Sequence, residues 1–142
     1  MTDNTLTRFI EAQQNVYPQV LKELRNGKKT SHWMWFIFPQ IQGLGHSSTA
    51  KYYSIKTIEE AKEYLAHPVL GKRLLECSNI ILEIKNKIAD EIFGYPDNLK
   101  LKSSMSLFNY VRNDQKAFAD VLKKYFSGKE DEQTLSILQK LN

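Results

Sequence analysis

Apolar side chains recur at alternating steps of three and four residues along almost the whole chain, which is the spacing of amphipathic helices. Phe9 and Val16 belong to a first such stretch, Val20 and Leu24 to a second, and Gly27 is suited to end the second helix. The pattern predicts helices over about 6–14, 15–26, 32–38, 48–53, 57–66 and 70–88, a turn ending near 94, and helices that begin near 97, 114 and 131.

The longest apolar pattern begins after the helix break at His67 and Pro68. Its steps of four and three predict one continuous helix whose apolar side packs against several neighbours. Because only one segment carries the pattern, we interpret it as part of a core rather than as a coiled coil. Its members are Leu70, Leu74, Cys77, Ile81, Ile84 and Ile88.

Several predicted helix starts carry side chains that accept hydrogen bonds from free backbone N–H groups. Thr57 and Glu60 have the spacing of a capping box, in which each side chain satisfies the other residue's backbone donor. The other predicted caps are Asn15, Ser31, Ser47 or Ser48, Asp97, Asp114 and Asp131. We find no strand pair, internal repeat or linker. The sequence therefore predicts an all-α fold, a single compact multi-helix domain over residues 1–142 with about seven to nine helices.

Composition supports one globular domain, with 142 residues, 42% hydrophobic and 25% charged. No stretch approaches the roughly 18 consecutive apolar residues of a membrane-spanning helix. The first residues lack the positive charge and apolar segment of a secretory signal, so we expect a cytoplasmic protein with no membrane partner. The net charge of +4 is compatible with an anionic ligand or with nucleic acid, and it requires neither.

Metal and disulfide chemistry find little support in the sequence. Cys77 is the single cysteine, which excludes an intramolecular disulfide and a cysteine-built metal site, and its spacing predicts a small buried side chain. The three histidines, His32, His46 and His67, have no ligand spacing, so we expect no metal. Spacing alone does not assemble a nucleophile with an adjacent base, and His32 with a serine from one of the polar stretches described below is the most that the sequence offers.

An aromatic segment between residues 32 and 38 is the most unusual local feature. Trp33, Phe36 and Ile37 share one helical face, which favours burial in the core. Trp35 and His32 lie on other faces, and a buried second indole needs an acceptor for its N–H. Because ligand sites are often concavities lined by aromatic side chains, we interpret Trp35 either as core or as the wall of a cavity.

Two polar stretches accompany the aromatic segment. The loop 42–48 carries Gly43, Gly45 and Ser47; a tight structural turn is the simpler interpretation, and anion binding at the start of the next helix is the alternative. Lys100 with Ser103 and Ser104 forms one polar face of a later helix. These serines either allow another helix to approach closely or hold a phosphate or carboxylate.

With these residues in view, the chain resembles the domain-of-unknown-function family 1810, an uncharacterised bacterial family. The resemblance runs from Arg8 to about Leu135, with Ser106 where the family pattern favours threonine. It implies a mainly α-helical fold and brings no established activity or cofactor. The segments that carry it are 31–40, Gly43 to Gly45 with Ser47, 64–71, 92–94, 100–105 and 107–108.

Three hypotheses about function follow. The first is a small-molecule site, with or without catalysis, in which the aromatic helix stacks a planar ligand such as a nucleotide or an ADP-ribose-like compound and the two polar stretches hold its anionic part. The second is a module that binds protein or nucleic acid through Lys28, Lys29 and the segment 51–53. The third is a helical domain whose aromatics are only core. Candidate ligand-binding residues are His32, Trp33, Trp35, Gln40, Gly43, Gly45, Ser47, Lys100, Ser103 and Ser104.

Overall fold

Ten α-helices and their connections account for residues 2–111 and 114–142, the ranges that the computed structural model describes, with side chains described from Leu6 onward. Every helix in these ranges is too short or too polar to traverse a lipid bilayer. The all-α prediction is confirmed. The helices are α1 Thr2–Gln14, α2 Tyr17–Arg25, α3 Met34–Ile37, α4 Ser48–Tyr52, α5 Ile58–Ala66, α6 Leu70–Glu83, α7 Ala89–Phe93, α8 Asp97–Val111, α9 Lys116–Phe126 and α10 Glu132–Leu141.

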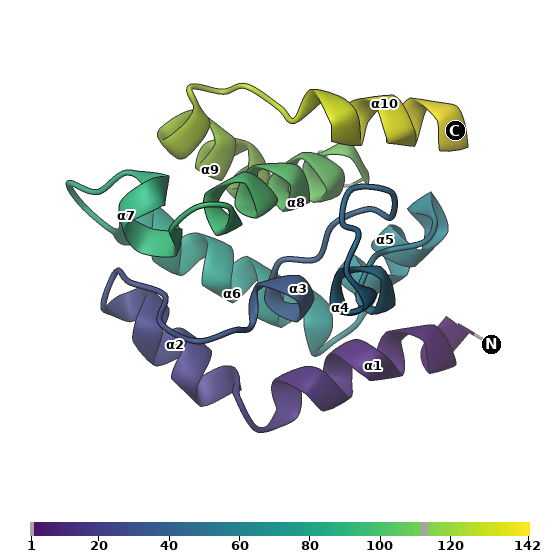
Figure 1. Ribbon diagram of the computed structural model, residues 1–142, viewed down its shortest axis with the longest axis horizontal. Helices are drawn as coiled ribbons and strands as arrows, with labels where there is room; N and C mark the ends of the chain where they lie inside the picture. The colour runs from purple at the N-terminus through teal and green to yellow at the C-terminus, as the bar shows by residue number, and fades with distance from the viewer. Residues whose placement is uncertain (1, 112–113) are drawn as a thin grey trace.

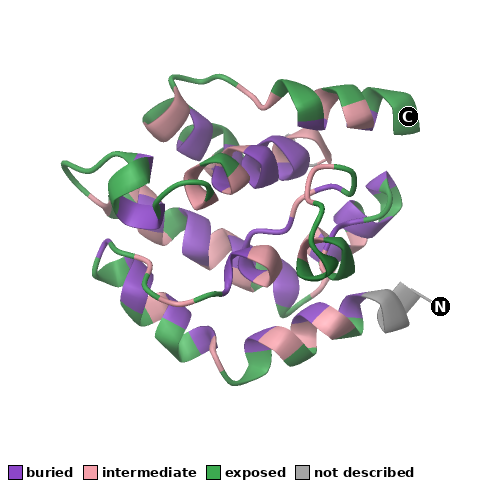
Figure 2. Ribbon diagram, viewed as in Figure 1, coloured by how far each residue is buried: buried purple, intermediate pink, exposed green. Residues whose placement is uncertain are grey.

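The helices pack around α6 and α8, which lie in the middle of the molecule (Figure 1). Helix α8 contacts α5, α7, α9 and α10, and helix α6 contacts α2, α5 and α9. In Figure 1, α1 and α2 lie along the bottom and α9 and α10 along the top. Figure 2 shows the buried residues concentrated on the central helices, with exposed residues along the outer faces of α1, α2 and α10.

The core is built on the inward face of α8, where Leu101, Met105 and Phe108 have no exposed surface. A series of aromatic rings crosses it. The ring of Phe108 lies 5.4 Å from that of Tyr64 and 6.0 Å from that of Phe118, and Tyr64 packs edge-on against Phe9 at 5.2 Å. These contacts join α1, α5, α8 and α9, so the four helices share one core.

Helix α6 is shorter than the apolar pattern predicts. It ends at Glu83, Asn86 adopts a left-handed conformation with φ of 63°, and Ile88 is 62% exposed. The prediction of one helix through Ile88 is therefore wrong. Two side chains of α9 bind the last carbonyl groups of α6: Lys124 donates to Leu82 and Ile84, and Tyr125 donates to Ile81. The end of α6 is thus set by contacts with α9.

Predicted helix caps fall into two groups. Ser47 accepts a hydrogen bond from Ala50 N, Thr57 from Glu60 N and Asp131 from Thr134 N, so these caps are confirmed. The caps predicted at Asn15, Ser31, Asp97 and Asp114 are wrong, because α2, α3 and α9 have Val16, Trp33 and Gln115 at the cap position, and Asp97 is already the first residue of α8.

The capping box at Thr57 forms only in part. Glu60 does not bind the N–H of Thr57; it accepts a hydrogen bond from the N–H of Lys56 at 2.8 Å. The same carboxylate also binds both terminal nitrogens of Arg8, at 3.2 and 3.3 Å. An ion pair with a distant residue has therefore drawn the Glu60 side chain away from the local arrangement that the spacing predicts.

Candidate functional site

A cavity of about 220 Å³ lies where the loop after α3 meets the first turns of α8 and α10. We call it the Lys100 pocket. It brings together four of the ten candidate residues, from segments sixty positions apart in the chain. Its lining residues are Gln40, Leu44, Gly45, Pro96, Leu99, Lys100, Ser103, Asp131 and Gln133.

Lys100 is the cationic group of this pocket. Its Nζ lies 3.4 Å from Asp97 Oδ1 and 5.1 Å from the centre of the Trp35 ring. The other oxygen of Asp97 binds Lys29 Nζ at 2.8 Å, so two ammonium groups share one carboxylate. Trp35 is half-buried and contacts the pocket through Lys100. The aromatic segment is therefore joined to the pocket by a cation–π contact and does not contribute a lining residue.

Trp33 has a different environment, in the core. It is 1% exposed, and its indole N–H donates to Glu23 Oε1 at 2.9 Å. The same oxygen accepts the backbone N–H groups of Thr30 and Ser31 at 2.7 and 3.0 Å. Oε2 accepts the Ser31 hydroxyl at 2.5 Å and the Gln19 amide at 2.9 Å. Glu23 thus organises the loop that leads into α3.

Glu23 remains charged in spite of its burial. Burial raises the pKa of its carboxyl, but the hydrogen bonds from Ser31, Thr30, Gln19 and Trp33 outweigh that effect and hold the pKa far below its ordinary value. We did not predict this residue from the sequence. The available indication was its position, because Glu23 lies between Val20 and Leu24 on the inward face of α2.

The serines of α8 bind helix α10. The Ser103 and Thr134 hydroxyls lie 2.7 Å apart, and Thr134 donates to Asp131 Oδ2. Ser106 accepts the backbone N–H of Asp131 at 2.9 Å. Ser104 is fully buried, outside the lining of the pocket, and its hydroxyl has no partner among the described residues. These contacts support close helix approach as the role of the serine-rich stretch.

The two glycines of the loop 42–48 are explained by backbone conformation at Gly43 and by packing at Gly45. Gly43 has a φ of +105°, which other residues rarely adopt. A Cβ atom on Gly45 would lie 2.5 Å from the Cβ of Ala50, so glycine lets the loop pack against α4. Ser47 is the cap of α4, and His32 is exposed, outside the pocket lining. Paired hydrogen bonds from Ile55 N to Gln40 O and from Gln42 N to Ile55 O fix the loop.

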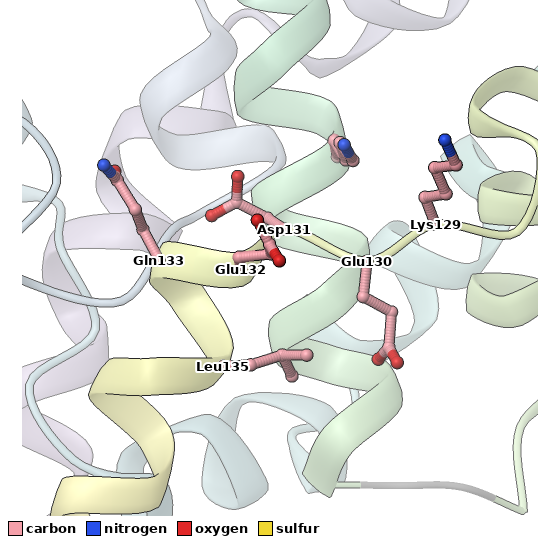
Figure 3. A pocket seen from close by; sticks show the side chains of 7 residues that line it. Lys129, Glu130, Asp131, Glu132, Gln133 and Leu135 are labelled. Carbon is pink, nitrogen blue, oxygen red and sulfur yellow. The ribbon is translucent and has the colours of Figure 1, made fainter.

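A broader concavity of about 790 Å³ adjoins the first turn of α10 (Figure 3). It shares Asp131 and Gln133 with the Lys100 pocket. Figure 3 shows the side chains of Lys129 and Glu130 pointing away from each other, with Gln133 on the far side of the turn. Within the described ranges, no group of three or more histidine, cysteine or acidic side chains is placed to hold a metal ion. The side chains around this concavity therefore do not meet at one point where a ligand group could bind.

The lining residues that the sequence did not suggest are mainly apolar. Leu99 is 47% exposed, Leu44 is half-buried, and Pro96 lies beside the 78% exposed Tyr95. Leu44 lies in a loop, and Pro96 and Leu99 lie at the start of α8, where the apolar periodicity is too short to show which way a side chain points. Asp131 was predicted only as a cap. The pocket thus combines one cation and several amide or hydroxyl groups with an apolar edge.

These features define an all-α domain whose Lys100 pocket is framed by the loop after α3 and the first turns of α8 and α10. A family model described as "Protein of unknown function (DUF1810)" matches residues 3–138, and the chain belongs to this family, as the resemblance indicated. The chain is also similar to the crystal structure of the conserved hypothetical protein Rv1873 from Mycobacterium tuberculosis, with 47% sequence identity and a TM-score of 0.93. That similarity covers 94% of this chain and 96% of the other. Comparison with curated proteins gave no match.

Proposed function

We propose that the protein binds a small molecule in the Lys100 pocket, and that this molecule carries one anionic group and an apolar or planar portion. The observation that carries the proposal is the convergence of Gln40, Lys100 and Gln133, from three separate segments, on one concavity. Concave sites with a few convergent polar groups and apolar walls are the usual form of small-molecule sites.

The charges around the pocket favour a single negative charge on the ligand. Asp97 balances two ammonium groups, Lys29 and Lys100, so one positive charge is left over at this edge. Lys29 is the closer partner, with an N–O distance of 2.8 Å against 3.4 Å for Lys100. Lys100 is therefore the cation better able to turn toward an anion. Asp131 adds a negative charge to the lining, which opposes a multiply charged group.

The remaining lining residues suit the uncharged part of such a ligand. The amides of Gln40 and Gln133 offer donors and acceptors, and Leu44, Pro96 and Leu99 offer apolar surface. Because Lys100 already lies over the Trp35 ring, direct stacking of a ligand on Trp35 finds no support. A carboxylate or a phosphodiester joined to an apolar or planar group matches this combination.

The binding-module hypothesis finds less support. Lys29 is bound by Asp97 and by the carbonyl of Ser31, and its Nζ lies 5.1 Å from the Trp33 ring. It is therefore committed to contacts within the molecule. Lys51 and Tyr52 remain exposed and together form a short cationic and aromatic surface. That surface is smaller than the grooves that bind single-stranded nucleic acid by stacking several bases.

Differential scanning fluorimetry with a panel of aromatic carboxylates, mononucleotides and dinucleotides tests the proposal. We expect at least one compound to raise the Tm of the wild type and of Lys62→Gln, which removes an exposed lysine of α5 outside the pocket. Lys100→Gln should weaken binding of that compound by about tenfold, the value of one charge-assisted hydrogen bond. The proposal fails when no compound stabilises the wild type, or when Lys100→Gln binds the active compound equally well.

A further inference from the structure

A second concavity, of about 300 Å³, borders the same loop and shares Gly45 with the Lys100 pocket. We call it the basic pocket. Two lysines and a histidine contribute to its lining, and no acidic residue does. This composition contrasts with the Lys100 pocket, whose lining includes Asp131. Its lining residues are Gln42, Gly43, Gly45, His46, Lys51, Ser54 and Lys56.

The carboxylate of Glu60, which contacts the backbone of Lys56 in this lining, is already balanced. Both of its oxygens accept hydrogen bonds from Arg8, at 3.2 and 3.3 Å, and Oε1 also accepts the backbone N–H of Lys56. Arg8 and Glu60 are both largely buried. Neither Lys51 nor Lys56 makes an ion pair with any acidic side chain of the described residues. The two lysines therefore keep positive charge that no acidic side chain in the described part of the chain offsets by direct contact.

Lys56 is held in place by neutral acceptors. Its Nζ donates to the carbonyl of Lys51 at 2.7 Å and to the hydroxyl of Ser54 at 2.8 Å. Burial lowers the pKa of Lys56, and the nearby positive charge of Arg8 lowers it further, while Glu60 acts in the opposite direction. The ammonium group is thus fixed in a site where an added negative charge would be stabilised.

The pocket also offers donors that carry no full charge. Within residues 2–111 and 114–142, the backbone N–H groups of Gly43, Gly45 and His46 have no hydrogen-bond acceptor, and neither do the side chains of His46 and Lys51. Gly45 and His46 are consecutive, and consecutive free N–H groups in a loop form concavities that bind anions. Two lysines together with such donors match the charge and the acceptor oxygens of a phosphate.

We propose that the basic pocket binds the phosphate monoester group of a small molecule. A monoester is close to doubly charged at neutral pH, which complements Lys51 and Lys56, and the concave shape suits a terminal group better than a continuous backbone. The phosphodiester backbone of a nucleic acid carries related chemistry, but it would need cationic residues beyond this pocket. This site does not depend on Lys100, so the two proposals stand or fall separately.

Titration of the ¹⁵N-labelled protein with inorganic phosphate and then with phenyl phosphate, followed by NMR, tests the site. We expect saturable shifts centred on the amides of Gly43, Gly45 and His46. Lys51→Gln should raise the Kd about tenfold, because it removes one charge-assisted contact. The Lys51 side chain makes no hydrogen bond or ion pair in the described part of the chain, so its replacement leaves the folded contacts intact. Lys62→Gln should leave the Kd unchanged.

Three outcomes would overturn the assignment. Weak shifts that do not saturate and spread over lysine-bearing surfaces would show an adventitious ion only. An unchanged Kd in Lys51→Gln would exclude this pocket as the site. A single-stranded oligonucleotide that binds more tightly than phenyl phosphate, with affinity falling steeply as salt rises, would assign the surface to nucleic acid instead. Lys100→Gln should retain phosphate binding, which separates this result from that of the Lys100 pocket.

Discussion

Replacement of Glu23 by glutamine would remove the negative charge that organises the loop before α3. Glutamine has the same shape, so the substitution creates no cavity and isolates the effect of charge. Three donors converge on Oε1, the N–H groups of Thr30 and Ser31 and the indole of Trp33. In Glu23→Gln these hydrogen bonds persist with a neutral acceptor. At the position of Oε2, the new NH₂ group would face the Gln19 amide, which is itself a donor, and the Ser31 hydroxyl, which would have to rotate and accept instead of donate.

The expected loss follows from these contacts. A hydrogen bond to a charged group contributes about 1.5–3 kcal/mol, and a neutral one about 0.5–1.5 kcal/mol. Weakening the three bonds to Oε1, reversing the one with the Ser31 hydroxyl and losing the one from Gln19 therefore costs about 4–5 kcal/mol. Glutamine also avoids the desolvation penalty of a buried carboxylate, which returns part of this amount. We expect the free energy of unfolding to fall by about 2–3 kcal/mol.

Urea unfolding followed by tryptophan fluorescence and by circular dichroism measures this change, since Trp33 itself contacts the altered group. Glu59→Gln is a matched control, because Glu59 is an exposed glutamate of α5. The control should change the free energy of unfolding by less than about 0.5 kcal/mol. A loss below about 1 kcal/mol in Glu23→Gln would refute the argument, because it would show that the charge contributes little beyond a neutral acceptor.

The same residue predicts a pH dependence. The pKa of Glu23 is lower in the folded protein than its ordinary value, so its contribution is complete above the unfolded pKa of about 4.3 and declines as the pH falls. The difference in stability between wild type and Glu23→Gln should therefore be constant above about pH 5.5 and shrink steadily toward acid. A difference that stays the same at pH 7 and pH 3 would contradict the low pKa.

Two further predictions concern the core. Gly71→Ala should destabilise the protein by about 2–3 kcal/mol, because the added Cβ would lie 2.0 Å from the carbonyl oxygen of Leu65. Asn79→Ala, on the exposed side of α6, should have little effect. Thermal unfolding compares the two variants, and equal Tm values would contradict the steric argument. Burial raises the pKa of the Cys77 thiol to about 12, although the hydrogen bond with Tyr17 acts in the opposite direction. A thiol reagent at pH 8 should therefore label one group per chain in urea and almost none in the native protein. Fast labelling of the native protein would contradict the raised pKa.

The fold could be predicted from the sequence because most of its determinants act within four residues. Apolar spacing located the inward face of α6 from Leu70 to Ile81, and local geometry set the caps at Ser47 and Asp131. The errors arose where a distant partner competes. Ser31 binds Glu23 and caps no helix, and the periodicity that includes Ile88 ignores the turn at Asn86 and the carbonyl contacts from α9. Such long-range contacts cannot be predicted from the spacing of neighbouring residues.

The candidate site could be predicted only in outline. The sequence identified Lys100, Ser103 and the glycine loop as unusual, and the structure places members of both stretches around one pocket. The sequence did not indicate that packing within the fold also accounts for these residues. The hydroxyl of Ser103 serves α10, and Gly45 makes room for Ala50. An unusual residue marks a local constraint, and the constraint is as often the packing of a neighbouring helix as the binding of a ligand.

Asp97 shows why the charge of the pocket had to come from the structure. Its contact with Lys100, three residues along α8, is a pairing that helical spacing predicts. Its closer contact is with Lys29, which lies in the loop before α3 and is nearly buried. Without Lys29, Asp97 would neutralise Lys100 and the pocket would have no cation to spare. The anion affinity proposed for Lys100 therefore depends on a lysine outside the pocket, whose side chain is fixed by the carbonyl of Ser31 and by Trp33 of the aromatic segment.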